Sequence, residues 1–275
     1  MAKTNKPSLQ GSCLLAERAP RTCRSERVDF AKAGLPEYAN SFAMLIHDIL
    51  TPDECQGFLE AAESTTNGKW EQAMVNIGNG KQALYTDTRN CGRIMWDDKV
   101  MAERLLARIQ RHLPPDILSL KDKAYVTGYG PVKRNETWRL SRLNERLRFL
   151  KYTSGMYFRE HCDGSYVTPD HKEISYLTIQ LYLNGDPAPV SADHAQPTES
   201  REDAKNDLPL VGGATRFFGN NCVDFVDVVP ESGSCLVFQH RNLLHSGEEV
   251  RILSQKPHRA THCAGFPPFP LANNS

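Results

Sequence analysis

The amino-acid sequence predicts a mainly β fold with flanking helices, an α+β arrangement whose strands form an antiparallel sandwich or jelly roll. Six short segments rich in β-branched and aromatic residues follow one another from about residue 146, separated by Gly, Pro, Asn and Asp. Two segments with helical periodicity precede them, at 41–64 and 97–115. With 275 residues, of which 40% are hydrophobic, the chain can bury the core that this fold needs.

The N-terminal part predicts an arm and two helices. Residues 1–38 are polar with little hydrophobic periodicity, which is typical of a flexible arm. A domain of residues 39–275 then begins with a helical support over 39–145. Thr51 is a good N-cap with Pro52 in the first turn and Glu54 three residues after the cap, so these residues predict a capping box.

The second helix is predicted to begin at Asp97 or Asp98 and to end at the Pro114–Pro115 pair. It carries an apolar stripe that would face the rest of the fold. The residues of this stripe are Val100, Met101, Leu105, Leu106 and Ile109.

The jelly-roll core is predicted over residues 146–268. Between its second and third segments, about residues 185–210 contain Pro, Asp, Glu, Ser and Ala with almost nothing to bury, which predicts a disordered insertion in the sheet. The six predicted strand segments are "RFLKYTSGMYF", "ISYLTIQLYLN", "GATRFF", "DFVDVV", "SCLVFQH" and "RATHCAGF".

Charge and cysteine content exclude several classes of protein. Lys+Arg and Asp+Glu are equal at 33 each, so no net field attracts nucleic acid or an anionic membrane. The 8 cysteines are scattered without a CxxC pair, which disfavours structural zinc and disulfides. Nothing resembles a signal peptide or reaches the roughly 20 apolar residues that span a bilayer. We expect a cytoplasmic protein, with the nucleus as the alternative, that is not secreted.

A candidate metal site begins with His161 and Asp163, two positions apart, so that both project to the same side of a strand end. With 9 histidines in the chain such a pair arises by chance, and His171 with Glu173 is a second example. His245, directly after a predicted strand, changes the balance. Two histidines and one carboxylate form the facial triad that suits non-haem Fe(II), and a distant strand can complete it only if the sheets close on each other.

Five ordered blocks carry a family resemblance over roughly residues 39–268. They are "RFLKYTSGMYFREHCDGSY", "SYLTIQLYLN", "GGATRFF", "VVPESGSCLVFQHRNLLHSGEEV" and "HRATHCAGF". Together they resemble the Fe(II)- and 2-oxoglutarate-dependent dioxygenases of the prolyl 4-hydroxylase type.

The resemblance implies a double-stranded β-helix core and a hydroxylase that couples oxidative decarboxylation of 2-oxoglutarate to hydroxylation of a C–H bond. It implies that His161, Asp163 and His245 hold Fe(II) and are the catalytic residues. O2 is then the second co-substrate, and L-ascorbate is an optional addition. The primary substrate would be a small molecule or a protein or peptide, with a prolyl residue as one option.

The far carboxylate of 2-oxoglutarate needs a cation, for which the sequence offers two. Family members carry a lysine about ten positions after the second histidine, and Lys256 stands at eleven. Arg259 shares a face of the last predicted strand with Thr261, which resembles the Arg-x-Ser pairs of other branches. We favour Arg259. Tyr152 and Tyr182 lie on strands whose counterparts line the co-substrate pocket, although a strand tyrosine is more often half-buried core.

Several other residues have a functional and a structural reading. Arg216 could point into a substrate channel, but a strand arginine is usually a paired surface group. Arg89, Arg93 and Trp96 precede the second helix, where substrate contact competes with ordinary packing. Cys162 lies between two of the proposed ligands, but its side chain should point away from the face that they share. Arg251 is expected to face solvent.

Two functions from other classes stay open. A cupin-like metal-dependent protein that is not an oxygenase would keep the metal ligands but needs no cation near residues 256–259. A catalytically degenerate module could keep the fold and bind a partner through the 185–210 loop. Succinate production separates the first from a dioxygenase, and an intact triad argues against the second.

Overall fold

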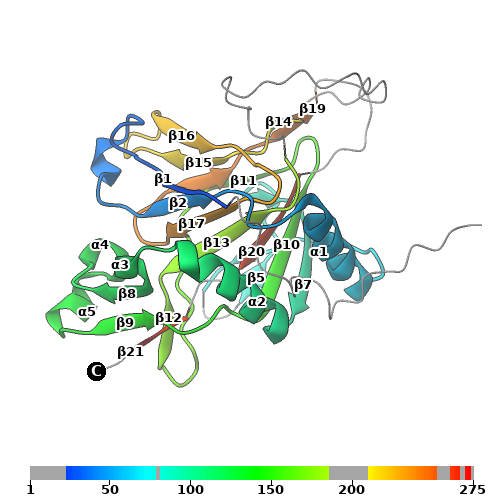
Figure 1. Ribbon diagram of the computed structural model, residues 1–275. Coiled ribbons are helices and arrows are strands. Elements are labelled where there is room, and N and C mark those ends of the chain that lie inside the picture. Colours follow the sequence, from blue (N-terminus) through cyan, green and yellow to red (C-terminus); the bar gives the residue numbers. More distant parts are fainter. Residues whose placement is uncertain (1–22, 79–80, 186–209, 253–260, 267–269, 274–275) are drawn as a thin grey trace, which may run out of the picture.

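The computed structural model describes residues 23–78, 81–185, 210–252, 261–266 and 270–273 (Figure 1). Strands dominate this part of the chain and the helices are few, so the mainly β prediction with flanking helices is confirmed. None of the described helices combines the length and the apolar character needed to cross a membrane.

Two antiparallel sheets form the body of the structure (Figure 1). The larger sheet has the order β1 (Ser25–Arg27), β2 (Ala43–Ile46), β17 (Cys235–Gln239), β13 (Leu177–Tyr182), β20 (Thr261–Phe266), β10 (Arg146–Tyr152), β7 (Gly92–Asp97), β3 (Glu71–Gln72). The second sheet has the order β16 (Phe225–Val228), β15 (Thr215–Phe218), β18 (His245–Gly247), β11 (Tyr157–His161), β6 (Arg89–Asn90).

Smaller sheets lie beside these two. The four-stranded one has the order β12 (Glu173–Ser175), β21 (Pro270–Asn273), β9 (Thr137–Leu140), β8 (Ser119–Lys121). The two-stranded ones are β14 (Leu210–Gly212) with β19 (Val250–Ile252), and β4 (Val75–Asn76) with β5 (Gln82–Ala83).

From residue 146 onward the chain passes back and forth between the two main sheets, with β15 and β16 consecutive in the second one. β10, β13, β17 and β20 lie in the larger sheet, and β11, β15, β16 and β18 lie in the second one. Side chains from both sheets meet in one buried cluster, for example Tyr182 and Phe238 of the larger sheet with Phe217 of the second. The two sheets therefore face each other across a shared core.

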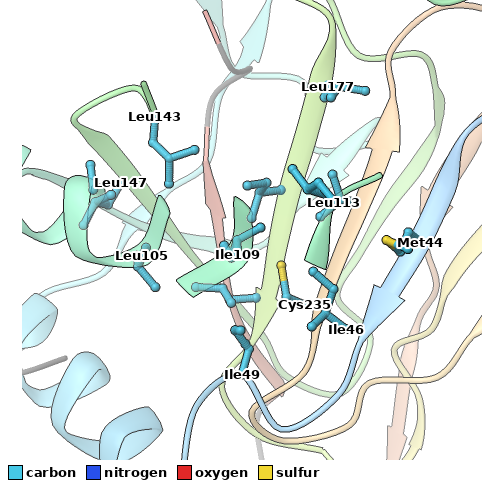
Figure 2. Close-up of a cluster of buried hydrophobic side chains, with 14 of the residues drawn as sticks. Met44, Ile46, Ile49, Leu105, Ile109, Leu113, Leu143, Leu147, Leu177 and Cys235 are labelled. Carbon is cyan, nitrogen blue, oxygen red and sulfur yellow. The ribbon is translucent and has the colours of Figure 1, made fainter. Parts of the chain in front are cut away.

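The opposite face of the larger sheet is covered by helices. β17 shows the period-two alternation that this requires: Cys235 and Val237 belong to the helix-side core, whereas Leu236 and Phe238 belong to the core between the sheets. Figure 2 shows Leu105 and Ile109 of helix α2 (Lys99–Ile109) clustered with strand residues on the helix side.

The remaining helices are α1 (Pro52–Thr65) and the short α3 (Pro115–Leu118), α4 (Ala124–Thr127) and α5 (Tyr129–Lys133), with 3-10 turns at Pro36–Tyr38 and Gln110–His112. The predicted capping box at Thr51 is confirmed, because Thr51 and Glu54 each accept the other's backbone N–H. Asp98 is the N-cap of α2 and accepts from the Met101 N–H. In the predicted stripe, Met101, Leu105 and Ile109 are buried, Leu106 is partly buried, and Val100 is exposed.

Two sequence-based boundaries are corrected. The flexible arm predicted for 1–38 is wrong over 23–38, because β1 pairs with β2 and Phe30, Leu35 and Tyr38 are buried in the core between the sheets. The helical support predicted for 39–145 also contains β2 and β7, which extend the larger sheet at either side. The predicted insertion at 185–210 falls almost entirely outside the described residues.

Helix α1 is tied to α2 by a buried ion pair. Arg108, only 2% exposed, donates to both carboxylate oxygens of Glu54 at 2.6 and 2.8 Å. Burial would raise the pKa of Glu54, but the hydrogen bonds from Arg108 and Thr51 outweigh burial and hold this pKa below its ordinary value. Glu54 therefore stabilises the fold in its ionised form.

We predict that Glu54→Gln lowers the free energy of unfolding by about 3 kcal/mol, since it leaves the Arg108 guanidinium buried without its anion. Thr51→Ala, which removes only the cap, should cost about 1 kcal/mol. Urea denaturation at pH 7 measures both. Because the pKa of Glu54 is depressed on folding, the difference between wild type and Glu54→Gln should shrink as the pH falls below about 4.5. Equal losses in the two variants would contradict this account.

Candidate metal centre

Three side chains with metal-binding atoms meet where two strands of the second sheet pair. His161 is the last residue of β11 and lies opposite His245, the first residue of β18. Asp163 follows β11 and places Oδ1 3.6 Å from His161 Nε2 and Oδ2 3.9 Å from His245 Nε2. One ligand atom from each residue lies within 4.8 Å of the others. No other such group of His, Cys, Asp or Glu forms within the described ranges.

A β-bulge sets the direction of His161. Between the pairs Phe158–Gly247 and His161–His245, β11 advances three residues and β18 only two. Phe158 and His161 would face opposite sides of a regular strand, because side chains alternate. The extra residue brings them to one side, and their rings stack with centroids 3.6 Å apart.

Both histidines are oriented by backbone carbonyls. His161 Nδ1 lies 2.8 Å from the Arg159 carbonyl, and His245 Nδ1 lies 3.1 Å from the Leu243 carbonyl. A carbonyl oxygen only accepts, so each Nδ1 carries the proton and each Nε2 presents a lone pair when the ring is neutral. This arrangement is the one found for metal-bound histidines.

The charges at the site suit a cation. Burial lowers the pKa of His245 to about 4, so this ring is neutral near pH 7. Burial alone would raise the pKa of Asp163, but the contact with His161 and the proximity of His245 outweigh it and hold this pKa well below its ordinary value. Thr178 Oγ1 also donates to Asp163 Oδ2. The site therefore offers one carboxylate and two imidazole nitrogens, a donor set that fits Fe(II).

A cavity of about 640 Å³ opens at these three residues. Thr178, Gln180 and Tyr182 line it from alternate positions of β13. The Tyr182 hydroxyl and Gln180 Nε2 each contact Thr215 Oγ1, at 2.8 and 3.0 Å. The part of the cavity wall formed by β13 and Thr215 is therefore polar and hydrogen-bonded.

The predicted co-substrate residues have different outcomes. Tyr152 and Tyr182 line the cavity, and both are also buried in the core between the sheets. Thr261 is the first residue of β20, where its backbone pairs with Tyr152. Arg259 and Lys256 lie outside the described residues. Their roles stay predictions.

The structural reading holds for three of the other candidates. Arg216 is paired with Asp227 at 2.7 and 2.8 Å and lies over the Phe225 ring, as a surface group. Arg93 donates to Glu71, and Trp96 packs in the helix-side core.

Two other motifs from the sequence take no part in the metal cluster. Burial and Asp163 raise the pKa of the Cys162 thiol, which keeps it protonated and a poor ligand. Glu173 of the second His-x-Glu pair instead accepts from Ser141 and Arg142.

Among the cavity residues that sequence reasoning missed are Thr178, Gln180, Thr215 and Arg148. For three of these residues the two-residue alternation of side chains along a strand was the available signal, since positions 178 and 180 share a face with Tyr182, and 148 shares a face with Tyr152. Arg89, for which packing was the favoured reading, also lines the cavity.

Comparison with solved structures finds prolyl 4-hydroxylases and other 2-oxoglutarate–Fe(II) oxygenases. A Pseudomonas putida prolyl-4-hydroxylase is 16% identical, with 88% of this chain and 100% of that chain covered and a TM-score of 0.47. A Trichoplax adhaerens prolyl hydroxylase, solved with a hypoxia inducible factor peptide fragment, is 12% identical over 87% and 89%, with a TM-score of 0.49.

A viral collagen prolyl hydroxylase from Paramecium Bursaria Chlorella virus-1 is 15% identical over 84% of this chain and 96% of that chain, with a TM-score of 0.41. No protein-family model and no curated protein matches the sequence. The overall likeness to these structures is low. The function is therefore inferred from the geometry of the chain's own residues.

We predict that His161→Ala, Asp163→Ala and His245→Ala each weaken Fe(II) binding by more than about 100-fold, because each removes a ligand from a three-ligand site. Anaerobic calorimetry with Fe(II), and with Mn(II) as an air-stable substitute, measures the affinity. Cys162→Ala and His171→Ala are the matched controls and should bind like wild type. Wild-type affinity in any one of the three ligand variants would remove that residue from the site.

Proposed function

We propose that the chain is a non-haem iron oxygenase that couples oxidative decarboxylation of 2-oxoglutarate to hydroxylation of a C–H bond. The observation that carries the proposal is the approach of His161, Asp163 and His245, with each histidine Nδ1 held by a carbonyl and each Nε2 directed to the shared point. Two histidines and a carboxylate with open positions are typical of non-haem Fe(II) oxygenases.

We further propose that residues 146–268 form a double-stranded β-helix. The strand order supports this, because β17-β13-β20-β10 faces β16-β15-β18-β11 and the chain crosses between the two sets at every step except from β15 to β16. Eight strands in two facing sheets are the arrangement of a jelly roll. Residues 39–145 would supply the helical cover together with edge strands of the larger sheet.

Fe(II) would be held by His161, Asp163 and His245, and when bound it supplies the redox chemistry that joins O2 to 2-oxoglutarate. In the overall reaction one oxygen atom enters succinate, one enters the substrate C–H bond as a hydroxyl, and CO2 leaves. The chain's own part is to keep the ligands oriented and water out. Phe158 stacked on His161, and Phe238 edge-on to His245 at 4.8 Å, form the apolar side of the site.

The co-substrate would extend from the metal into the core between the sheets. Tyr152 and Tyr182 offer hydroxyls there, and Thr261 would add one more. For the far carboxylate we propose Arg259 in preference to Lys256, because a guanidinium can bind a carboxylate with two parallel hydrogen bonds. A prolyl residue of a peptide and a small molecule are the two substrate classes for the hydroxylation.

We predict that the purified protein releases succinate from 2-oxoglutarate only when Fe(II) and O2 are present. Arg259→Ala should raise the apparent 2-oxoglutarate constant by roughly 30-fold or more, as expected for loss of one partner of a buried charge pair. Lys256→Ala should change it only a few-fold. Succinate release across a 2-oxoglutarate series measures both variants against wild type.

The outcomes of this series are distinct. The reverse ranking assigns the far carboxylate to Lys256. If wild type releases succinate and neither variant changes the apparent 2-oxoglutarate constant, the cation that binds the far carboxylate is a different residue of the chain. No succinate from wild type loaded with Fe(II) contradicts the oxygenase function and favours the metal-dependent non-oxygenase.

A further inference from the structure

The cavity beside the metal ligands contains two guanidinium groups without a carboxylate partner. Arg148 of β10 and Arg89 of β6 both line it, and the Nε atom of each is buried with no hydrogen-bond partner. Across the described ranges neither residue forms an ion pair. Both side chains are only partly exposed, and a partly buried cation without a counter-charge favours the binding of an anion.

Neighbouring arginines show the contrast. Arg146, two positions before Arg148 on the same face of β10, donates to both oxygens of Asp97 at 2.8 Å. Arg93, in the adjacent strand β7, donates to Glu71 at 2.9 and 2.8 Å. The lack of a partner is therefore specific to the two arginines that lie deeper in the cavity.

Apart from Asp163, the carboxylates that line the cavity are paired with other arginines: Asp97 with Arg146, Glu145 with Arg142, and Glu248 with Arg216. Burial raises the pKa of Tyr152 well above its ordinary value and the pKa of Cys263 to about 12, so these two of the neighbours of Arg89 stay protonated, and Cys91 is a third neighbour. Burial and then the charges of Arg89 and Arg93 lower the pKa of Arg148, which indicates an excess of positive charge around it. Asp163 lies close enough to oppose this effect, but it belongs to the metal site.

The two arginines lie at different depths in the cavity, as the residues of β10 that line it show. Residues 146, 148, 150 and 152 line the cavity in turn, from the half-exposed Arg146 side chain to the buried Tyr152. Arg148 thus lies between the mouth and the deep end, near Asp163. Arg89 lies at the deep end, beside Tyr152 and over the Phe158 ring. Of the two unpaired arginines, Arg148 is therefore the one nearer to the exposed end of β10 and to Asp163.

A count of formal charges gives the sign and the magnitude of the charge that would neutralise the cavity. Fe(II) contributes two positive charges, Asp163 one negative charge and 2-oxoglutarate two, which leaves one negative charge. Arg89 and Arg148 add two positive charges, so the loaded cavity carries one positive charge. One further monoanion makes it neutral, and Arg259 at the far carboxylate would only increase the need for it.

We propose that the primary substrate carries a carboxylate and that Arg148 binds it. The inference rests on the proposed oxygenase function and narrows its substrate to an acid, either a small molecule or an acidic peptide. Arg148 is then the residue that selects the substrate, since a planar guanidinium matches a carboxylate with two hydrogen bonds. A neutral analogue would leave the guanidinium buried and unpaired, so it should bind much more weakly.

The test compares acids with their primary amides on protein loaded with Mn(II) and saturating 2-oxoglutarate. The probes are N-acetyl-L-proline, 3-phenylpropionate, benzoate and N-acetyl-L-leucine, each with its amide, and calorimetry gives the affinities. We expect wild type to bind at least one acid about 10-fold or more tightly than its amide. Arg148→Met should abolish the preference, Arg148→Lys should restore part of it, and Arg146→Met, the matched control with a paired arginine, should keep it.

The proposal is overturned if no acid binds wild type more tightly than its amide, or if Arg148→Met keeps the preference. Loss of 2-oxoglutarate binding in Arg148→Met would assign this arginine to the co-substrate and overturn it as well. Binding of 2-oxoglutarate to Mn(II)-loaded wild type is measured first. Its absence overturns the proposed function and this inference together, whereas its presence without a preference for acids overturns this inference alone.

Discussion

One irregularity in a strand pair governs the geometry of the metal centre. The bulge in β11 inserts a residue between Phe158 and His161, so that both rings face the core between the sheets while His161 stays opposite His245. A slip of one residue would turn the histidine to the other face of the sheet. β18 is held between β11 and β15, so the position of His245 is fixed from both sides. The ligands thus inherit their directions from backbone pairing and need little adjustment when a metal binds.

The two cores have different tasks. The helix-side core buries α1 and α2 against the larger sheet and stabilises the fold without contributing to the metal centre. The core between the sheets is apolar around Phe217 and Phe238 but gives way to Thr178, Gln180 and Thr215 near the cavity. Polar groups are tolerated there because they bond one another. The Nε atoms of Arg89 and Arg148 are the exception, and neither guanidinium has a carboxylate partner, which is the basis for the proposed substrate carboxylate.

Much of the centre could be predicted from sequence, because it depends on residue type and local spacing. His161, Asp163 and the capping box of Thr51 are local patterns, and the alternation in β13 is visible in "LTIQLY". Features that depend on distant pairing could not be predicted. β1 has three exposed residues and no hydrophobic pattern, yet it joins a sheet through β2. Arg146 and Arg148 look alike in sequence, and only the long-range contact with Asp97 shows which one is neutralised.

The central claim is that His161, Asp163 and His245 hold a metal with positions left open for a keto acid. Anaerobic titration of the Fe(II)-loaded protein with 2-oxoglutarate, followed by visible absorption and calorimetry together, tests it most directly. The account predicts one equivalent of 2-oxoglutarate per bound metal, a new charge-transfer absorption, and binding at least about 10-fold weaker without metal. Binding of equal strength with and without Fe(II), or metal binding with no change on adding 2-oxoglutarate, would contradict it.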